Sequence, residues 1–509
     1  MGYLDWASQP SPFRSFAGAA AFALYPRPDA PAPDRTPGRL TAAVVGDVLR
    51  HALGLSAWKQ YREARWSLRV NPSSGNLHPT EAYVVCGPLP GLAAAASVYH
   101  YAADRHDLEQ RCAFDADAWT MPADEGAATW LVAITSIHWR ESWKYGERAF
   151  RYCQHDLGHA IAAVRIAAEL CGWRARMCPD WSQRDIAALT GIDRDEDFFE
   201  AEREEPGCLL ALEPSSFAGH GLQARDRTTL IDAVRAGRWS GRASQLSEDH
   251  VEWTFIDEIA RATADPGRSI TPAIQSANSS IQSPDHQITP SPDRALVLQR
   301  RSAVAFDGRS SIDLDGFLAI LAAAMPAAAS PRDAMWWDAR IHLALFVHRV
   351  DGLEPGLYVL VRNARAHEAL KAAMTRDFAW QRVTDRLPLF MLARGDCRRM
   401  AQRVSCDQEI ASDGFFSLGM LAEFDASLRE FGPAFYRHLF WESGVVGQAL
   451  YLEAEAAGAR ATGIGCFYDD PVHDVFGLAD HAFQSLYHFT IGMPVEDGRL
   501  STEPGYSWG

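Results

Sequence analysis

The chain has 509 residues, more than one typical core accommodates, which predicts two or three domains. With 47% hydrophobic and 22% charged residues, its composition is typical of a soluble globular protein. The net charge of −16 at pH 7 argues against a nucleic-acid surface, because phosphate binding requires clustered Lys and Arg.

The sequence also bears on compartment. No uninterrupted apolar run reaches about 18 residues, so we expect no membrane span. The short apolar run at 17–24 is unlike a secretion signal, since Asp5 precedes it and prolines flank it. The nine cysteines are scattered and none forms a CxxC pair. This pattern fits thiols of a reducing compartment, and we expect a cytoplasmic protein.

Several elements follow from residue patterns along the first half. Residues 1–40 are rich in proline and aromatic residues and predict an N-terminal arm. Helical spacing of apolar residues predicts a helix over 40–55. Residues 144–173 predict a long helix, and because its middle, 160–170, is apolar on most sides, we expect it to be buried. Short apolar stretches predict strands at 82–85, 98–101, 127–135 and 208–212.

A change of composition divides the chain. Residues 264–293 are dominated by Pro, Ser, Thr, Gln, Asn and Asp, with scarcely any large apolar side chain. Such a segment cannot build a core and predicts a flexible linker. We therefore expect one domain over 41–263 and a second over 294–509.

The second half repeats the first. Residues 437–461 align without gaps onto 151–175 (437 − 151 = 286), and eight of the 25 pairs are identical. The paired glycines and arginines weigh more than the alanine pairs, because alanine is common in helices. The predicted strand at Leu131 is matched to 388–392. We interpret the chain as a tandem duplication, in which two like domains reproduce a two-fold dimer within one chain.

Residues 69–83 are dense in polar groups with little side-chain bulk. Ser73, Ser74 and Asn76 supply hydroxyl and amide groups, and Gly75 permits close approach to the main chain. Pro72 and Pro79 stiffen both flanks. The stretch predicts a preformed cradle for a planar, hydrogen-bonding ligand, with an ordinary surface turn as the alternative.

Two short strings in the second half point to the same kind of ligand. Arg300, Arg301 and Ser302 suit an anionic group, although a solvated basic turn has the same composition. The string 462–467 places Gly463 and Gly465 around Ile464. Two glycines allow the main chain to lie against a flat ring, and a helix-ending turn is the alternative.

In their order, these strings resemble the flavin-binding segments of the nitroreductase superfamily, most closely its SagB-type (thiazole/oxazole-forming) dehydrogenase branch. Residues 143–148 and 156–159 resemble that branch strongly, and 491–494 resembles the family's closing strand. The resemblance implies an α+β fold with two tandem nitroreductase-like domains. Each would have a mostly antiparallel sheet flanked by helices, and together they would form an intrachain pseudo-dimer that binds FMN.

The resemblance also implies roles for particular residues. Lys144 and Tyr145 match a pair implicated in proton removal from an azoline substrate, whereas a helix cap and a packing residue are the structural alternative. The implied FMN contacts are Arg69, Pro72, Ser73, Ser74, Gly75, Asn76, Arg300, Arg301, Ser302, Gly463, Ile464 and Gly465. Val304 stands where the family often has a further basic residue, and Arg499 is a candidate substitute.

Each half carries only part of this set. The first half has no clear Arg-Arg-Ser string, and Phe13-Arg14-Ser15 is a poor counterpart. The second half has 325–331 where the first has the 72–76 string. In homodimers of the family each flavin is shared between two subunits. The resemblance therefore implies one composite flavin site, and one FMN, per chain.

We expect an FMN-dependent oxidoreductase with a small-molecule or peptide substrate. It would dehydrogenate a peptide-derived or small heterocycle, or reduce nitro or quinone compounds with NAD(P)H. A flavin-binding or flavin-sequestering protein without turnover is the alternative, and a scaffold partner in a peptide-modifying complex is a third. No GxGxxG string follows a strand, which disfavours a fixed dinucleotide site. His155 and His159 have metal-binding spacing, but no third ligand is apparent, so we expect no metal.

Overall fold

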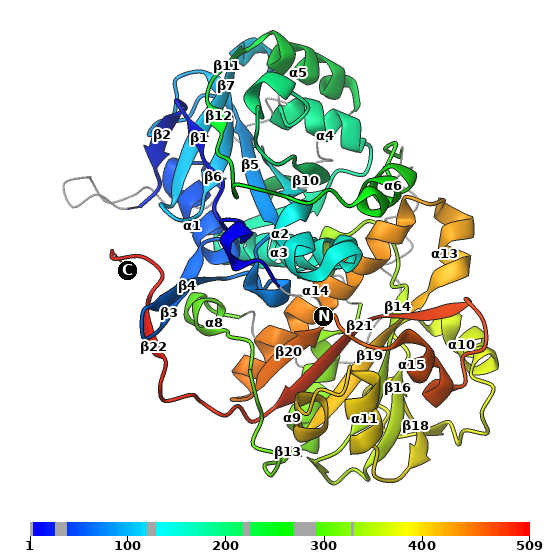
Figure 1. Ribbon diagram of the computed structural model, residues 1–509. Coiled ribbons are helices and arrows are strands. Elements are labelled where there is room, and N and C mark those ends of the chain that lie inside the picture. The colour runs from blue at the N-terminus through cyan, green and yellow to red at the C-terminus, as the bar shows by residue number, and fades with distance from the viewer. Residues whose placement is uncertain are drawn as a thin grey trace. The chain divides into compact units, whose positions relative to one another are not determined.

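The computed structural model describes residues 4–25, 38–119, 129–216, 224–268, 292–326 and 330–508 (Figure 1). The chain divides into two compact units. Unit 1 comprises Met1–Ile274, Asp333–Trp336 and Leu500–Gly509, and unit 2 comprises Gln275–Arg332 and Trp337–Arg499. Most of the predicted linker, residues 269–291, lies outside the described residues. The three domain boundaries derived from the sequence stay predictions.

Unit 1 is built on an antiparallel sheet with the strand order β11-β7-β6-β5-β8-β10-β9, and β2 also pairs with β7. Its strands are β2 (Ala20–Ala23), β5 (Thr80–Cys86), β6 (Ala96–Ala102), β7 (Asp107–Phe114), β8 (Trp130–Ser136), β9 (Trp173–Met177), β10 (Glu205–Pro214) and β11 (Arg238–Trp239). Helices α4 (Gln183–Thr190) and α5 (Ala224–Ala236) share a hydrophobic core with one face of this sheet. Since β5, β6 and β8 are buried along their whole length, their sequences are mostly apolar rather than alternating, and the buried Glu81 and His100 are exceptions.

Helix α3 (Ala149–Leu170) packs against β8 and β9, and α1 (Ala42–Ala52) packs against α3. Helices α2 (His138–Tyr145) and α6 (Thr254–Ala262) also belong to unit 1. The predicted helix over 144–173 is wrong at its start. Gly146 adopts φ 57 and ψ −136 and ends α2, so Lys144 and Tyr145 lie on α2 and the long helix begins at Ala149.

Both ends of the chain pair with unit 1. Strand β1 (Phe16–Ala17) pairs with β12 (Arg242–Ala243), and β22 (Ser501–Pro504) joins β3 (Leu55–Tyr61) and β4 (Ala64–Arg69) in a three-stranded sheet. Tyr506 anchors the C-terminal tail, because its buried hydroxyl donates to the Ala103 carbonyl at 2.6 Å and accepts from the Leu55 amide at 3.0 Å.

Unit 2 has the antiparallel strand order β17-β18-β16-β14-β19-β21-β20, and a two-stranded parallel pair, β13-β15. Its strands are β13 (Ile312–Asp313), β14 (Ile341–Val347), β15 (Val350–Asp351), β16 (Gly356–Leu360), β17 (Gln381–Arg382), β18 (Leu389–Arg394), β19 (Phe416–Glu423), β20 (Arg460–Ile464) and β21 (Phe483–Gly492). Its helices are α8 (Arg294–Gln299), α9 (Leu314–Ala323), α10 (His367–Ala373), α11 (Arg398–Val404), α12 (Ile410–Asp413), α13 (Phe424–Phe431), α14 (Phe435–Ala456) and α15 (Asp469–Phe476).

The described residues also contain short 3₁₀ turns: η1 (Trp6–Ser8), η2 (Ser74–Asn76), η3 (Ala116–Ala118), η4 (Gly146–Arg148), η5 (Asp195–Asp197), η7 (Arg332–Ala334) and η8 (Ala364–Ala366).

The two units have the same construction. Helices α3 and α14 each contain 22 residues and begin 286 positions apart (435 − 149 = 286). Helices α2 and α13 begin at the same separation (424 − 138 = 286), and so do β8 and β19 (416 − 130 = 286). The predicted α+β class with two like domains is therefore confirmed.

One predicted correspondence is wrong. The strand at Leu131 is β8, which lies between β5 and β10, and its counterpart β19 lies between β14 and β21. The segment 388–392 forms β18, which occupies the place of β7. Short apolar strands resemble one another, so only the pairing order distinguishes them.

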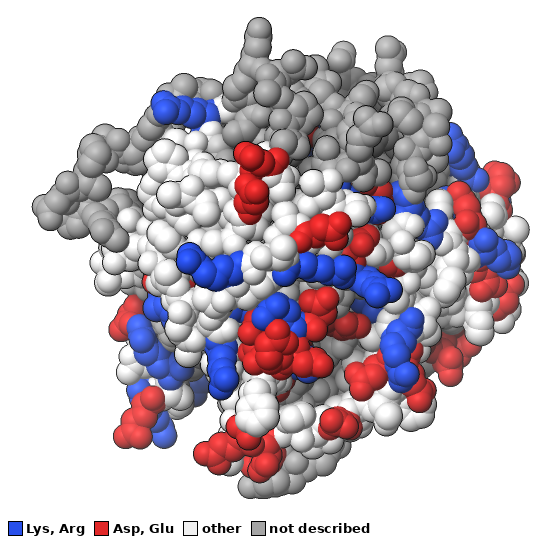
Figure 2. Space-filling model, turned by 90° about the horizontal axis from the view of Figure 1, so that it is seen from above, with Lys and Arg blue, Asp and Glu red and all other residues white. Residues whose placement is uncertain are grey.

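Charge is not gathered into a single patch on the face shown in Figure 2, where acidic and basic side chains are interspersed. Within the described part of the chain, no helix is both long enough and apolar enough to cross a bilayer.

Candidate functional site

The predicted cradle lies between β4 and β5 of unit 1 and is held in shape by its own polar groups. Gly75 has a φ of 60 within η2. The Asn76 side chain donates to the Ser67 carbonyl at 2.9 Å and contacts the His78 ring at 3.0 Å. The His78 amide donates to the Ser73 hydroxyl at 2.8 Å. Several polar groups of the loop are therefore used in hydrogen bonds that fix its conformation.

Hydrogen bonds to helix α3 hold the loop in place. The Asp156 carboxylate accepts hydrogen bonds from the Ser74 amide at 3.1 and 3.2 Å and from the Ser74 hydroxyl at 3.2 Å. The Ser73 hydroxyl lies 3.4 Å from Oε1 of Glu141, on α2. Two elements far apart in sequence from the loop thus fix Ser73 and Ser74.

The two carboxyl groups are fully buried and carry unusual proton affinities. Burial raises the pKa of Asp156 to about 7, although hydrogen bonds from Ser73 and Ser74 oppose the shift. Burial, and then the charge of Asp156, raise the pKa of Glu141 well above its ordinary value. The pair can therefore hold a proton at neutral pH, directly beneath the loop.

Tyr145 lies against the exposed face of the same loop. A Cβ added at Gly75 would collide with the Tyr145 hydroxyl and lie 3.1 Å from its ring carbons. The Tyr145 ring packs edge-on against Tyr152, with centroids 4.8 Å apart. The exposed Lys144 places its Nζ 5.2 Å from the Tyr145 ring centroid. The structure thus brings the predicted catalytic pair and the predicted cradle together.

Arg69 and Pro72 contribute differently. Both are buried, and the Arg69 guanidinium donates to the Thr80 carbonyl at 3.1 Å and the Pro12 carbonyl at 2.6 Å. These contacts tie the N-terminal arm to the start of β5. A contact of Arg69 with FMN stays a prediction.

In unit 2 the structure brings the two predicted strings together. Ser302 forms a parallel bridge with Ala461, and the Ala303 amide donates to the Ala461 carbonyl at 3.1 Å. The Thr462 hydroxyl donates to the Ala303 carbonyl at 2.6 Å. The segment 300–303 therefore lies alongside β20, next to the residues of that strand that precede Gly463.

Tyr451, which the sequence reasoning missed, connects both strings. Its hydroxyl accepts from the Gly463 amide at 2.9 Å and lies 2.9 Å from the Ser302 hydroxyl. The buried Arg300 guanidinium lies 4.9 Å from the centroid of the Tyr451 ring. No local sequence pattern distinguishes Tyr451, because it is one of several aromatic residues within the long, largely apolar helix α14.

The predicted basic residues differ in exposure. Burial lowers the pKa of Arg300, partly offset by Tyr451 and Glu455. Arg301 is half-buried and donates to the Leu298 and Arg300 carbonyls, both at 2.7 Å, whereas Ser302 is exposed. Arg499 is exposed and forms an ion pair with Asp497 at 2.7 Å, and Val304 is 88% exposed.

Gly463 has a packing role of its own. A Cβ there would collide with the Tyr487 hydroxyl and lie 2.7 Å from its Cζ. Ile464 is buried at the end of β20, and Gly465 follows it half-buried. The glycine at 463 is thus required by Tyr487 whether or not a flavin binds, and its flavin role stays a prediction.

The chemical types of the residues present suit the phosphate and the ring of a flavin. In unit 2, Arg301 and Ser302 offer charged and hydroxyl donors at the surface. In unit 1, Gly75 offers exposed main chain with little bulk beside the Tyr145 hydroxyl. Each set is compact within its own unit.

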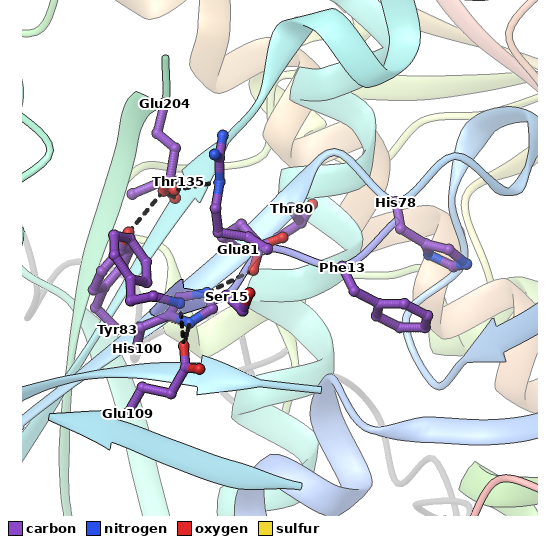
Figure 3. Close-up of polar contacts among 12 residues, drawn as sticks. Phe13, Ser15, His78, Thr80, Glu81, Tyr83, His100, Glu109, Thr135 and Glu204 are labelled. Carbon is purple, nitrogen blue, oxygen red and sulfur yellow. Dashed lines mark hydrogen bonds and ion pairs between the residues drawn. The ribbon is translucent and has the colours of Figure 1, made fainter. Parts of the chain in front are cut away.

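The counterpart of the basic string in unit 1 is committed to the protein interior. Arg14 is 1% exposed, donates to the Glu202 and Ser244 carbonyls, and forms an ion pair with Glu204 at 3.6 Å. Oε2 of Glu204 also accepts from the Tyr83 hydroxyl at 3.0 Å and the Thr135 hydroxyl at 2.8 Å (Figure 3). Arg14 thus serves an internal network.

A histidine between two carboxylates extends that buried network. The His100 ring lies 2.9 Å from Glu81 and 2.9 Å from Glu109 (Figure 3). Burial alone would lower the pKa of His100, but the hydrogen bonds and charges of Glu109 and Glu81 outweigh it and raise the pKa to about 9. Burial opposes ionisation of Glu81, but Arg140 and His100 lower its pKa to about 2. These shifts favour the ionised forms of both His100 and Glu81 in the core.

Among the residues described, no group of three or more His, Cys, Asp and Glu side chains is arranged to hold a metal ion. His155 and His159 are buried in the middle of α3.

Two like α+β units, each with one of the polar segments described above, make up this duplicated chain. The chain belongs to the nitroreductase family, whose model matches residues 36–201 and 297–493. Both regions fall on the repeated parts of the chain. No curated protein matches this chain.

Solved structures with this fold include a putative nitroreductase from Anabaena variabilis, with 20% identity, a TM-score of 0.71 and coverage of 97% of this chain and 96% of that one. A putative nitroreductase from Ralstonia eutropha has 16% identity and a TM-score of 0.30, covering 42% of this chain and 90% of its own. The Escherichia coli microcin synthetase McbBCD complex has 16% identity and a TM-score of 0.27, and the match covers 36% of this chain and 75% of that chain. At these identities the first similarity establishes the fold alone.

Proposed function

We propose that the chain is an FMN-dependent oxidoreductase that binds one flavin per chain and dehydrogenates a peptide-derived or small heterocyclic substrate, as SagB-type enzymes do. The proposed flavin contacts are residues 69 and 72–76, residues 300–302, residues 463–465 and Arg499. The support for one flavin is the division of these segments in the sequence, since each half keeps only one part of the set.

The position of Tyr145 carries the proposal. Its hydroxyl lies against Gly75, where the main chain of the cradle is exposed, and Lys144 lies over its ring. The Tyr145 hydroxyl therefore lies beside exposed main chain that a bound ligand can reach. A proton acceptor at this point would take a proton from a substrate bound over the exposed main chain of the cradle.

The reaction removes a proton and a hydride from adjacent atoms of the heterocycle. FMN, when bound, supplies the hydride acceptor. Tyr145 and Lys144 take the proton from the substrate. Asp156 and Glu141 fix Ser73 and Ser74, and the proton they hold keeps negative charge low beneath the loop. Reduction of nitro or quinone compounds with NAD(P)H is the broader version of the same activity.

The first test is the flavin content and its redox response. The purified protein is expected to hold one FMN per chain, and two per chain would contradict the proposal. Under anaerobic conditions, an azoline-containing peptide or NAD(P)H is expected to bleach the flavin spectrum. A flavin that photoreduces but resists every donor would instead identify a flavin-sequestering protein.

The second test separates catalysis from binding. Tyr145→Phe is expected to lower the dehydrogenation rate by about 100-fold or more while the flavin stays bound, because a general base typically contributes a factor of that size. Tyr61→Phe, near the tip of the β3–β4 hairpin, is the matched control and should leave the rate unchanged. Equal rates in the two variants would remove Tyr145 from the mechanism. Co-purification with a cyclodehydratase, without activity alone, would indicate a scaffold role.

A further inference from the structure

Two cysteines from distant parts of the sequence meet in unit 2. Cys406 follows α11 in a turn with a φ of 56, and Cys466 follows β20 directly after Gly465. Their Sγ atoms are 2.7 Å apart. A disulfide has an S–S distance of about 2.05 Å, so bond formation requires a movement of only roughly 0.7 Å.

Other contacts hold the two segments together independently of sulfur. The Gln408 side chain donates to the Ser405 carbonyl at 2.8 Å and to the Cys466 carbonyl at 3.2 Å. The Tyr468 amide donates to the Val404 carbonyl at 2.9 Å. Because the fold already positions both segments, cross-linking requires little further ordering of the chain.

Six of the remaining cysteines are chemically quiet by comparison. Burial raises the pKa of Cys86, Cys112 and Cys397 to about 12, and it also raises the pKa of Cys153, Cys178 and Cys208 well above the ordinary value. Since the thiolate is the reactive form, these thiols exchange slowly at neutral pH. Cys406 and Cys466 are half-buried and within reach of solvent, as Cys171 and Cys178 also are.

We propose that Cys406 and Cys466 form a redox-active dithiol that closes to a disulfide by exchange with a small-molecule disulfide of the glutathione class. One cysteine thiolate attacks a sulfur of the small disulfide and forms a mixed disulfide, and one small thiolate leaves. The second cysteine then attacks the protein sulfur of the mixed disulfide, and the second small thiolate leaves. Two protein thiols are oxidised, one small disulfide is reduced to two thiols, and no other oxidant is required.

The site also adjoins the predicted flavin loop. Closure ties the turn after α11 to the residue next to Gly465, so the main chain of 463–465 loses freedom in the oxidised form. The resulting change in flavin retention rests on the proposed function, whereas disulfide formation does not.

The test is oxidation of the full-length protein in glutathione buffers of graded composition, followed by alkylation and peptide mass mapping. We expect one intramolecular cross-link between the Cys406 and Cys466 peptides, formed reversibly, with both cysteines alkylated under reducing conditions. Cys171→Ser, which removes another half-buried cysteine, is expected to leave the cross-link intact. Cys406→Ser is expected to convert Cys466 to a stable mixed disulfide with glutathione.

Wild-type protein with both cysteines separately glutathionylated, or fully alkylated after oxidation, would overturn the proposal without any variant. Flavin retention is then measured in the oxidised and reduced forms. A cross-link in a protein that binds no flavin in either form would leave the dithiol standing and remove the proposed function. Flavin binding without a cross-link would remove the dithiol proposal and leave the proposed function standing.

Discussion

Asp156 and Glu442 occupy the same position in the two repeats (442 − 156 = 286), yet they have opposite electrostatic surroundings. Each accepts hydrogen bonds from the backbone near the start of a central strand: Asp156 from Ser74, and Glu442 from Arg340 at 3.0 Å. Glu442 also pairs with Arg362 at 2.8 Å, whereas Asp156 has Glu141 near the same loop. Burial opposes ionisation of Glu442, but Arg362 and Arg332 outweigh it and lower its pKa.

This difference predicts opposite effects of neutralising the two acids. The pKa of Asp156 is raised from 3.8 to about 7, so its stabilising contribution is complete below pH 3.8 and is lost as pH rises through about 7. Asp156→Asn keeps an acceptor for Ser74 without the charge. We expect urea unfolding at pH 8 to show the variant as stable as wild type or more so, by at most about 4 kcal/mol.

Glu442→Gln is the matched control on the equivalent helix. It leaves the buried Arg362 without its carboxylate, and we expect a loss of roughly 3–5 kcal/mol at pH 8. Similar losses in both variants would show that the two acids have the same structural role.

The His100 network predicts a second pH dependence. Glu109 and Glu81 raise the pKa of His100 from 6.5 to about 9, so its contribution is complete below pH 6.5 and is lost as pH rises through about 9. The unfolding free energy of the wild type should fall over this range, by roughly 3 kcal/mol. In His100→Gln this part of the fall should be lost, whereas the exposed His481→Gln should retain it. An unchanged slope in His100→Gln would show that the histidine is neutral in the native state.

Gly75 and Gly172 form a natural pair for testing the loop. Both have positive φ, 60 and 77, but a Cβ at Gly75 collides with Tyr145 and a Cβ at Gly172 meets nothing within 4 Å. Replacement by alanine should cost about 1 kcal/mol at either position through backbone strain. Only Gly75→Ala should also lower dehydrogenation, by displacing Tyr145. Equal activity in the two purified variants would separate Tyr145 from the reaction.

Tyr451 predicts a connection between the basic string and the glycine loop of unit 2. Tyr451→Phe removes the hydroxyl contacts to Ser302 and Gly463 but keeps the ring beneath Arg300. Loss of a hydrogen bond of about 1 kcal/mol predicts a several-fold to tenfold rise in the Kd for FMN, measured by fluorescence titration. Tyr436→Phe on the same helix is the control. Unchanged FMN affinity in Tyr451→Phe would show that the two strings act separately.

The sequence alone predicted the duplication, because a constant offset survives wherever helices keep their length. It also located the strings around Ser73, Ser302 and Gly463, since each is continuous along the chain. The pairing order of the strands was only partly predictable, and β18 was matched to the wrong partner. The sequence of a short apolar strand does not indicate which strands it pairs with.

The break at Gly146 was missed, because a single glycine inside a helical pattern is compatible with a continuing helix. Only the tertiary structure placed the Tyr145 hydroxyl against Gly75, joined Ser302 to Tyr451, and set Cys406 beside Cys466. These contacts link residues 60 or more positions apart, and spacing along the chain does not encode them. The proton affinities of Asp156 and Glu141 have the same origin, because burial and neighbouring charge exist only once the chain has folded.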